Sequence, residues 1–180
     1  MASSYSSDLS LELITTGEKA GLWGTITNTN LQILQQAASG YVAVPMTSGS
    51  DVTLSLADGS DTANGKNLYL KLTGTMTASI SLIIPAATTG GTARRTYIIE
   101  DATDRTTANN YTINIKTAGS ASPVPLPEGA NVIVRSDGTD TALAFIKPGI
   151  KNITAATITT YTSVNGDQVV VDTQANPVTI

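Results

Sequence analysis

Residues 13–41 read LITTGEKAGLWGTITNTNLQILQQAASGY, and they hold the only Trp and the only helical pattern of the chain. At about 100° per residue, residues 25–41 place apolar side chains on one arc and amide or hydroxyl side chains on the other. The apolar arc contains Leu31, Ile33, Leu34, Ala37, Ala38 and Tyr41, and the polar arc contains Asn28, Gln32, Gln35, Gln36 and Ser39. We therefore predict an amphipathic helix over 25–41, capped by Thr25 or Thr27 and ended by a left-handed Gly40.

The predicted helix carries no charge, because no Asp, Glu, Lys or Arg occurs between Lys19 and Asp51. Exposed helices normally carry charged side chains, whereas neutral amides can be buried against a partner at a much lower cost than ions. The helix is therefore either packed on its own domain with a neutral outer face, or a docking helix that is covered on both sides. We favour docking, with one face buried by the chain itself (Leu31, Leu34, Ala38) and the other by assembly (Gln32, Gln35, Gln36).

The residues before the helix divide into three short segments. Residues 1–8 are Ser-rich and are expected to form an arm that is flexible or ordered by a partner. Leu9, Leu11 and Leu13 alternate with polar residues, which predicts a short strand. Residues 15–24 form a Gly-containing loop, in which Trp23 is either a core residue of a small N-terminal unit or a docking anchor.

From Tyr41 onward the apolar period changes to two, which indicates strands. Alternating or short apolar runs occur at 52–56, 68–72, 80–82, 97–99, 111–115, 132–135 and 143–145. Turn signals separate them at Asp58-Gly59, Asn64-Gly65, Gly90-Gly91, Asp137-Gly138 and Asn165-Gly166. The prediction is a mainly β protein, in which the arm and one helix (1–41) precede a β-sandwich or jelly-roll-like domain (42–147). Pro123, Pro125 and Pro127 mark an extended segment that cannot be a central strand.

Residues 148–180 predict the start of a second β module. The segment from Tyr97 to Ile113 has an echo between Gln168 and Ile180, since both read as a strand, an acidic turn, Ala-Asn and a strand that begins with Thr-Ile. Chance similarity in a Thr- and Asn-rich chain is the alternative. Because the second copy stops where its last strand begins, we expect the 180 residues to be the ordered N-terminal part of a longer protein.

The composition excludes several classes of function. The chain lacks both Cys and His, which removes disulfides, thiolate metal sites, the commonest zinc ligand and the Ser-His-Asp arrangement. A net charge of −4 gives no attraction to nucleic acid or to anionic membrane. No apolar run approaches the ~20 residues of a membrane span, and no signal peptide is evident, so synthesis in the cytoplasm without membrane insertion is expected. We predict no enzymatic activity, no cofactor and no metal.

Two acidic clusters were considered as sites. Asp58, Asp61 and Asn64 resemble a calcium loop, but the twelfth position is Tyr69 where a bidentate Glu is needed, so a structural turn is expected. Glu100, Asp101 and Asp104 lie near Arg94, Arg95 and Arg105. A carboxylate pair for glycoside hydrolysis would need an aromatic-lined cleft, so we expect solvated strand ends, with ion pairs across a subunit boundary as a further option.

A resemblance to a known family covers about the first 45 residues. Its residues are Tyr5-Ser6-Ser7-Asp8-Leu9, Leu11-Glu12-Leu13-Ile14, Thr16-Gly17-Glu18, Gly21, Trp23-Gly24-Thr25 and Thr27-Asn28-Thr29-Asn30-Leu31. This segment resembles the start of tail-fibre and related virion proteins of short-tailed bacteriophages, where β modules rich in Thr, Gly and Asn follow.

The resemblance implies a virion structural protein made in the host cytoplasm, most simply the N-terminal anchor of a tail fibre. It implies a homotrimer that docks on tail adaptor or nozzle proteins, with host glycans or receptors contacted only by parts beyond residue 180. The expected docking residues are Leu9, Leu11, Leu13, Trp23, Asn28, Leu31, Gln32, Leu34, Gln35, Gln36 and Tyr41. A head-decoration or neck fibre protein, or a carbohydrate-binding β-sandwich with a row of exposed aromatic residues, are the alternatives.

Overall fold

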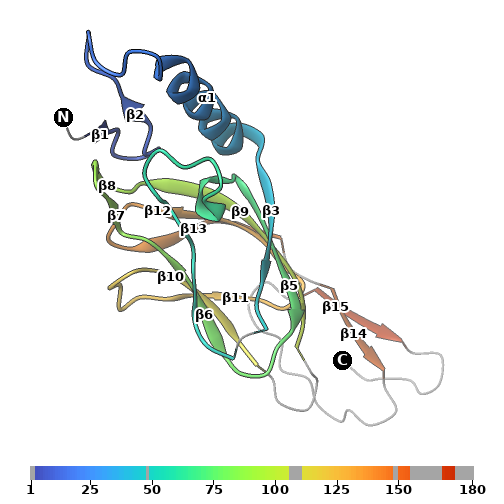
Figure 1. The fold of residues 1–180 in the computed structure, drawn as a ribbon. Coiled ribbons are helices and arrows are strands. Elements are labelled where there is room, and N and C mark those ends of the chain that lie inside the picture. Colours follow the sequence, from blue (N-terminus) through green and yellow to red (C-terminus); the bar gives the residue numbers. More distant parts are fainter. Residues whose placement is uncertain (1–2, 48, 106–110, 148–149, 155–167, 173–180) are drawn as a thin grey trace.

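The computed structural model describes residues 3–47, 49–105, 111–147, 150–154 and 168–172. It is mainly β with one α-helix, as predicted (Figure 1). The elements in chain order are β1 (Ser4–Tyr5), β2 (Glu12–Leu13), α1 (Trp23–Ser39), β3 (Tyr41–Pro45), β4 (Val52–Thr53), the 3-10 helix η1 (Asn64–Lys66), β5 (Tyr69–Thr75), β6 (Ile80–Ile84), β7 (Ala87–Thr88), β8 (Gly91–Thr92), β9 (Arg95–Asp104), β10 (Ile113–Thr117), β11 (Val124–Leu126), β12 (Asn131–Ser136), β13 (Thr141–Lys147), β14 (Ile150–Thr154) and β15 (Gln168–Asp172).

Two sheets face each other and enclose the core. The five-stranded sheet has the order β13-β12-β9-β5-β3, and the four-stranded sheet has the order β11-β10-β6-β4. Alternate residues of the strands point inward, so that Leu70, Leu72 and Ile99 of one sheet meet Leu82 and Ile115 of the other in a single apolar cluster. The period-two pattern of the sequence therefore identifies the core-facing side chains.

The chain alternates between the two sheets in three successive passes. Each pass gives one strand to the five-stranded sheet and the next to the four-stranded sheet: β3 then β4, β5 then β6, and β9 then β10. Consecutive passes pair in parallel, since β3 pairs with β5, β5 with β9, β4 with β6 and β6 with β10. The core of the domain thus resembles three turns of a solenoid, to which β11, β12 and β13 add antiparallel strands.

Parallel pairing explains why several turn signals do not form hairpins. Gly90 lies in the β7–β8 hairpin and Asp137-Gly138 in the β12–β13 hairpin, but Asn64-Gly65 lies in η1. A parallel neighbour needs a crossover connection, and here the opposite sheet provides it. Pro125 lies in β11 at the edge of its sheet, as expected for a strand that contains proline. Asn165-Gly166 and most of the predicted second module lie outside the described residues; within 148–180, β14 pairs in parallel with β15.

The N-terminal arm is folded against the chain's own β domain over residues 3–8, so our prediction of a flexible or partner-ordered arm is wrong for these residues. Thr88 donates its hydroxyl hydrogen to the Ser7 carbonyl (2.8 Å), and the Arg94 N–H donates to Asp8 Oδ1 (3.0 Å). The arm passes so close to Gly90 that a Cβ atom there would lie 2.4 Å from the Tyr5 carbonyl oxygen. The lack of a side chain at the hairpin turn therefore makes room for the arm.

The predicted strand over Leu9, Leu11 and Leu13 is present only as Glu12–Leu13. Ser10 interrupts it with a positive φ of 55°, is fully buried, and accepts a hydrogen bond from the Gly59 N–H at its carbonyl (2.8 Å). A residue in this conformation cannot continue an extended strand. Leu9 and Leu11 are partly buried, whereas Leu13 is exposed, with half of its surface accessible to solvent.

The helix begins two residues earlier than predicted and ends two residues earlier. Its N-terminal cap is Leu22, without a side-chain hydrogen bond, so the prediction of a Thr25 or Thr27 cap is wrong. Gly40 has φ −67° and ψ 144°, which is extended and not left-handed, because the chain passes directly into β3. A Cβ atom at Gly40 would lie 2.4 Å from Asn67 Oδ1, so a close approach, and not a positive φ, accounts for this glycine.

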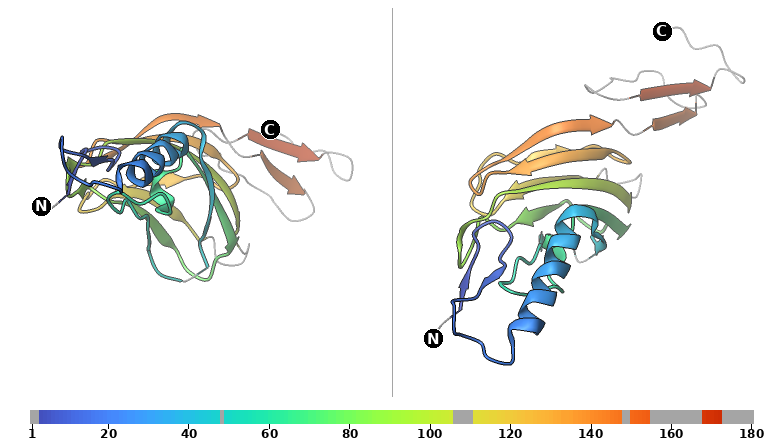
Figure 2. Two further views of the ribbon diagram at one scale, coloured as in Figure 1. Left: turned by 45° about the horizontal axis from the view of Figure 1, so that its top comes forward. Right: turned by 90° about the horizontal axis from the view of Figure 1, so that it is seen from above.

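The chain enters and leaves the five-stranded sheet at opposite edge strands. The helix leads into β3 at one edge, and the chain leaves the sheet through β13 at the other edge (Figure 2). Four strand spacings separate these edges, a span of about 19 Å. The N-terminal region and the continuation of the chain therefore lie on opposite sides of the β domain.

Candidate docking surface

The helix packs on its own domain through one narrow side. Ile33 is fully buried, and Ile26, Asn30 and Ala37 on the same side are half-buried. Asn30 holds the preceding segment with two hydrogen bonds: its Oδ1 accepts from the Glu12 N–H (3.0 Å), and its Nδ2 donates to the Glu12 carbonyl (2.9 Å). This side fixes the rotation of the helix about its axis.

Most of the apolar arc faces away from the β domain. The exposed fractions are 64% for Trp23, 57% for Leu31, 41% for Leu34 and 59% for Tyr41, and Ala38 is also exposed. The prediction that Leu31, Leu34 and Ala38 are buried by the chain itself is therefore wrong. The apolar arc spans about 160°, and the β domain covers only the edge of it near Ile33. The rest of the arc is therefore exposed on the isolated chain.

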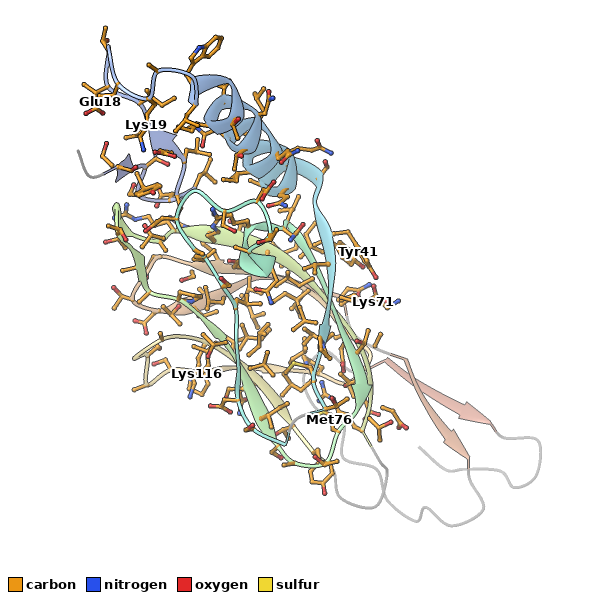
Figure 3. All side chains as sticks on the ribbon, viewed as in Figure 1. Glu18, Lys19, Tyr41, Lys71, Met76 and Lys116 are labelled. Carbon is orange, nitrogen blue, oxygen red and sulfur yellow. The ribbon has the colours of Figure 1, made fainter. Side chains whose placement is uncertain are left out.

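Trp23 and Tyr41 lie at opposite ends of this exposed face. Trp23 begins the helix, and its exposure shows that the prediction of a core residue is wrong. Tyr41 lies at the start of β3, below the end of the helix (Figure 3). Its ring stacks on Tyr69 with ring centroids 5.7 Å apart. The Tyr69 hydroxyl donates to Glu100 Oε2 (2.8 Å), and Lys71 pairs with Glu100 Oε1 (3.1 Å). These contacts hold the aromatic pair at the edge of the sheet.

Of the three glutamines on the helix, two are exposed and one is half-buried. Gln32 and Gln35 are exposed, as is Asn28, whereas Gln36 is half-buried and takes part in the fold. The Gln36 carbonyl accepts from the Leu68 N–H (3.0 Å), and its Nε2 donates to the Asp61 carbonyl. The three glutamines and Asp61 line a shallow depression of about 360 Å³. Gln36 thus serves the fold first, and Gln32 and Gln35 remain available to a partner.

The segment before the helix carries an ion pair. Lys19 pairs with Glu12 (2.9 Å) before the helix, and the Ser3 hydroxyl also donates to Glu12 (2.7 Å). The Ser3 and Lys19 hydrogen bonds lower the pKa of Glu12, and the Glu12 carboxylate raises the pKa of Lys19. Residues 20–50 carry no charge, so the helix itself exposes amides and apolar side chains. A nearby charged residue is Asp61, which lines the depression with Gln32, Gln35 and Gln36.

Two buried cations beneath the helix were not expected from the sequence. Lys66 in η1 is fully buried and Arg95 at the start of β9 is 8% exposed. Within the described part of the chain, Lys66 Nζ and Arg95 Nε and Nη2 have no hydrogen-bond partner. Burial, followed by the charge of Arg95, lowers the pKa of Lys66 to about 8, although Asp58 and Asp61 oppose this shift. A Lys in an Asn-Gly-Lys turn normally predicts exposure, so no signal in the sequence reveals this burial.

Replacing Lys66 with Met is expected to stabilise the fold by roughly 1–3 kcal/mol at pH 7, because the pKa difference represents about 1.4 kcal/mol per unit. The folded-state pKa is lower than the unfolded value of 10.5. The cost of burying the charge is therefore fully present below pH 8 and disappears as the pH rises towards 10.5. Denaturant unfolding of both proteins at pH 7, 9 and 10 should show the advantage of Lys66→Met shrinking. A constant difference would contradict the burial of a charged Lys66.

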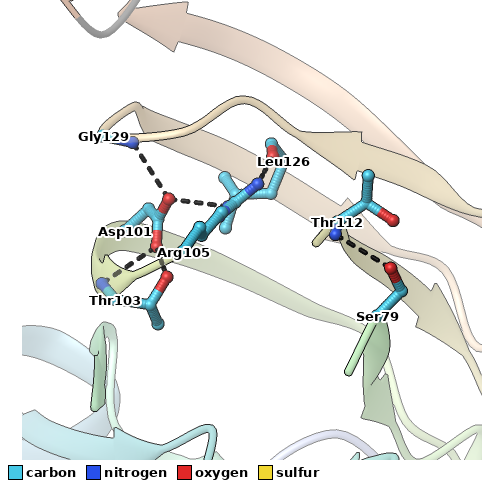
Figure 4. A network of polar contacts seen from close by, with 7 residues as sticks. All are labelled: Ser79, Asp101, Thr103, Arg105, Thr112, Leu126 and Gly129. Carbon is cyan, nitrogen blue, oxygen red and sulfur yellow. Dashed lines mark hydrogen bonds and ion pairs between the residues drawn. The ribbon is translucent and has the colours of Figure 1, made fainter. Parts of the chain in front are cut away.

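The second acidic cluster is part of the fold. Asp101 Oδ2 accepts from Arg105 Nη2 (2.6 Å) and from the Gly129 N–H (2.9 Å), and Asp101 Oδ1 accepts from the Thr103 hydroxyl (2.6 Å) (Figure 4). Both ionic side chains are almost completely buried. Our expectation of solvated strand ends, or ion pairs between subunits, is wrong for this pair, which links β9 to the loop before β12 inside one chain. Asp104 is exposed, as expected.

The described residues contain no group of three or more acidic side chains that could hold a metal ion. Asn64 of the calcium-loop-like segment is used structurally, since its Oδ1 accepts from the Ser55 N–H (2.7 Å). Within the same described ranges, α1 and η1 are too short or too polar for a helix that crosses a membrane. No protein-family model, curated protein or solved structure matches this chain.

Proposed function

We propose that this chain is a structural protein of a bacteriophage virion and forms the N-terminal anchor that attaches a tail fibre to the tail, as a homotrimer. The observation that carries this proposal is the exposed, uncharged surface of α1, which begins at Trp23 and includes Leu31 and Leu34. Exposed apolar side chains that include an aromatic residue are typical of a surface that becomes covered in an assembly. The sequence resemblance of the first 45 residues supports the assignment to a virion.

The direction of the chain also supports an anchor. Residues 3–45 form the arm, the helix and the edge strand β3, whereas β13 leaves from the opposite edge of the sheet. A protein that holds a fibre needs its attachment surface and its outgoing chain on different sides. The β domain between them is braced by a continuous apolar core, which suits a mechanical role. Its partners would be tail adaptor or nozzle proteins.

Gln35→Glu tests the attachment surface. The exposed Gln35 tolerates a carboxylate in the isolated chain, but an interface that covers it would hold an unpaired charge. We expect the variant to fold like the wild type but to be incorporated into particles at least about tenfold less. This reduction corresponds to a loss of about 1.4 kcal/mol or more in binding free energy. Quantitative mass spectrometry of virions assembled with each variant measures this incorporation.

Ser122→Glu is the matched control, since Ser122 is exposed on a loop of the β domain and receives the same charge. It should be incorporated normally. If Gln35→Glu is incorporated as well as the control, the amide face of α1 is not an attachment surface.

A further inference from the structure

Four exposed positions of α1 follow the spacing of a coiled-coil seam. Thr27, Leu31, Leu34 and Ala38 are separated by four, three and four residues, and all four side chains are exposed. Alternating spacings of three and four mark the a and d positions of a heptad repeat. Here the apolar Leu31 and Ala38 take a, the apolar Leu34 takes d, and the polar Thr27 takes the other d position. The pattern holds for the part of the helix that the β domain leaves uncovered.

The opposite side of the helix is already occupied, which separates the two roles. Ile26 and Ile33 fall at the c positions of the same heptads, and they are the residues that pack on the chain's own domain. A buried c position turns the a and d positions outward. The helix therefore presents its seam to the surroundings in a fixed rotation.

The flanks of the seam admit another uncharged helix. Asn28 and Gln35 take the e positions, where many coiled coils carry charges that select the partner. The chain has a net charge of −4, yet residues 20–50 carry no charge, so two copies can bring these segments together without repulsion between like charges. A partner of opposite charge would gain nothing here. The charge pattern is thus compatible with a second copy of the same neutral helix.

The size of the patch also fits helix-to-helix contact. Together with Trp23, the seam presents an apolar area on the order of a few hundred Å², which is typical of the largest patch on a monomer. Burial of such an area by each copy makes a small interface. The extended contacts of an assembled fibre would then add to it.

We propose that the exposed face of α1 is a self-association surface, on which the α1 helix of a second copy of this chain packs in parallel, with Leu31 and Leu34 forming the central layers. This inference deepens the proposed function by naming the contact between subunits, and it rests on that function only for the expectation of several copies. The seam then belongs to the subunit contact, and Gln32, at a b position that faces away from the seam, belongs to the attachment to the tail. Gln35, at an e position, borders both surfaces.

Cross-linking tests the contact directly, because the chain contains no cysteine. Ala38→Cys places a thiol at an a position, where the same residue of a parallel neighbour faces it within the ~7 Å between Cα atoms that a disulfide requires. Ser39→Cys is the matched control, since it is the adjacent exposed residue at a b position that faces away from the seam. Mild oxidation of the full-length proteins should give a cross-linked dimer for Ala38→Cys and at least tenfold less for Ser39→Cys. An antiparallel arrangement would bring Ala38 to Thr27 and leave Ala38→Cys unlinked.

Sedimentation equilibrium of the full chain supplies the second measurement. Wild type should have a mass that is a multiple of 18.5 kDa. Leu34→Glu should shift the mass to a single copy while the far-UV circular dichroism is unchanged, whereas Gln32→Glu should remain associated. A wild-type monomer at 50 µM, or equal cross-linking at residues 38 and 39, would overturn the self-association surface. A wild-type monomer would also contradict the homotrimer of the proposed function, whereas the attachment to the tail is tested separately by incorporation into particles.

Discussion

Replacing Asp101 with Asn is expected to lower the free energy of unfolding by about 3–5 kcal/mol, the range for removing one partner of a buried ion pair. The Asp101 side chain is fully buried and pairs with Arg105, whose side chain is 6% exposed. Loss of the carboxylate leaves the guanidinium charge in the interior with the Leu126 carbonyl as an acceptor (3.1 Å). The Gly129 N–H also loses an ionic acceptor. Denaturant unfolding measures the change.

Asp104→Asn is the control for this prediction, since Asp104 lies on the same strand and is exposed. It should change the stability by less than about 0.5 kcal/mol. Replacing both ionic residues, as Asp101→Asn with Arg105→Met, should recover part of the loss because no buried charge remains unpaired. Equal effects of Asp101→Asn and Asp104→Asn would contradict a buried, structural ion pair.

Ile33→Ala is expected to destabilise the isolated chain by about 2–5 kcal/mol, whereas Leu34→Ala should cost less than about 1 kcal/mol. The two positions are adjacent on one helix, but Ile33 is fully buried against the β domain and Leu34 is 41% exposed. Truncation of Ile33 leaves a cavity, while truncation of Leu34 only trims an exposed side chain. Thermal and denaturant unfolding under conditions where the chain is monomeric measure both.

The contrast between these neighbours decides the rotation of α1. A cost of 2–5 kcal/mol at Leu34, which the sequence alone would predict for a core position, would show that the helix packs on its domain through the Leu31–Leu34 face. The Leu34→Ala effect should instead appear where copies associate. Unfolding at increasing protein concentration should therefore separate Leu34→Ala from wild type progressively.

Periodicity predicted the helix and the core-facing residues of the strands, because both depend on local geometry. It did not predict which part of the apolar arc packs on the domain, since Ile33 and Leu34 are equally apolar and only the position of the β domain distinguishes them. The pairing of strands was missed for a similar reason. The apolar alternation of residues 69–75 and 80–84 would be the same in a parallel and in an antiparallel sheet. The local sequence therefore does not indicate that the strands pair in parallel.

One buried charge could have been recognised in the sequence. Asp101 lies two residues after Ile99 and four after Tyr97, so its side chain points to the same face of β9. Tyr97 and Ile99 both face the core. An acidic residue at an inward position needs an ionic or hydrogen-bonding partner, and Arg105 follows four residues later. For Lys66 no such signal exists, because its burial follows from the packing of η1 beneath α1 and not from any alternation.

The most direct test of the central proposal is a cryo-EM map of intact particles that contain this chain. The account predicts that density for residues 3–45 lies against the tail, with the amide face of α1 contacting a tail protein, the Leu31 and Leu34 faces of neighbouring copies touching each other, and β13 directed away from the particle. Density for the chain on the head surface, or α1 exposed to solvent on both its amide and apolar faces, would contradict the proposed anchor.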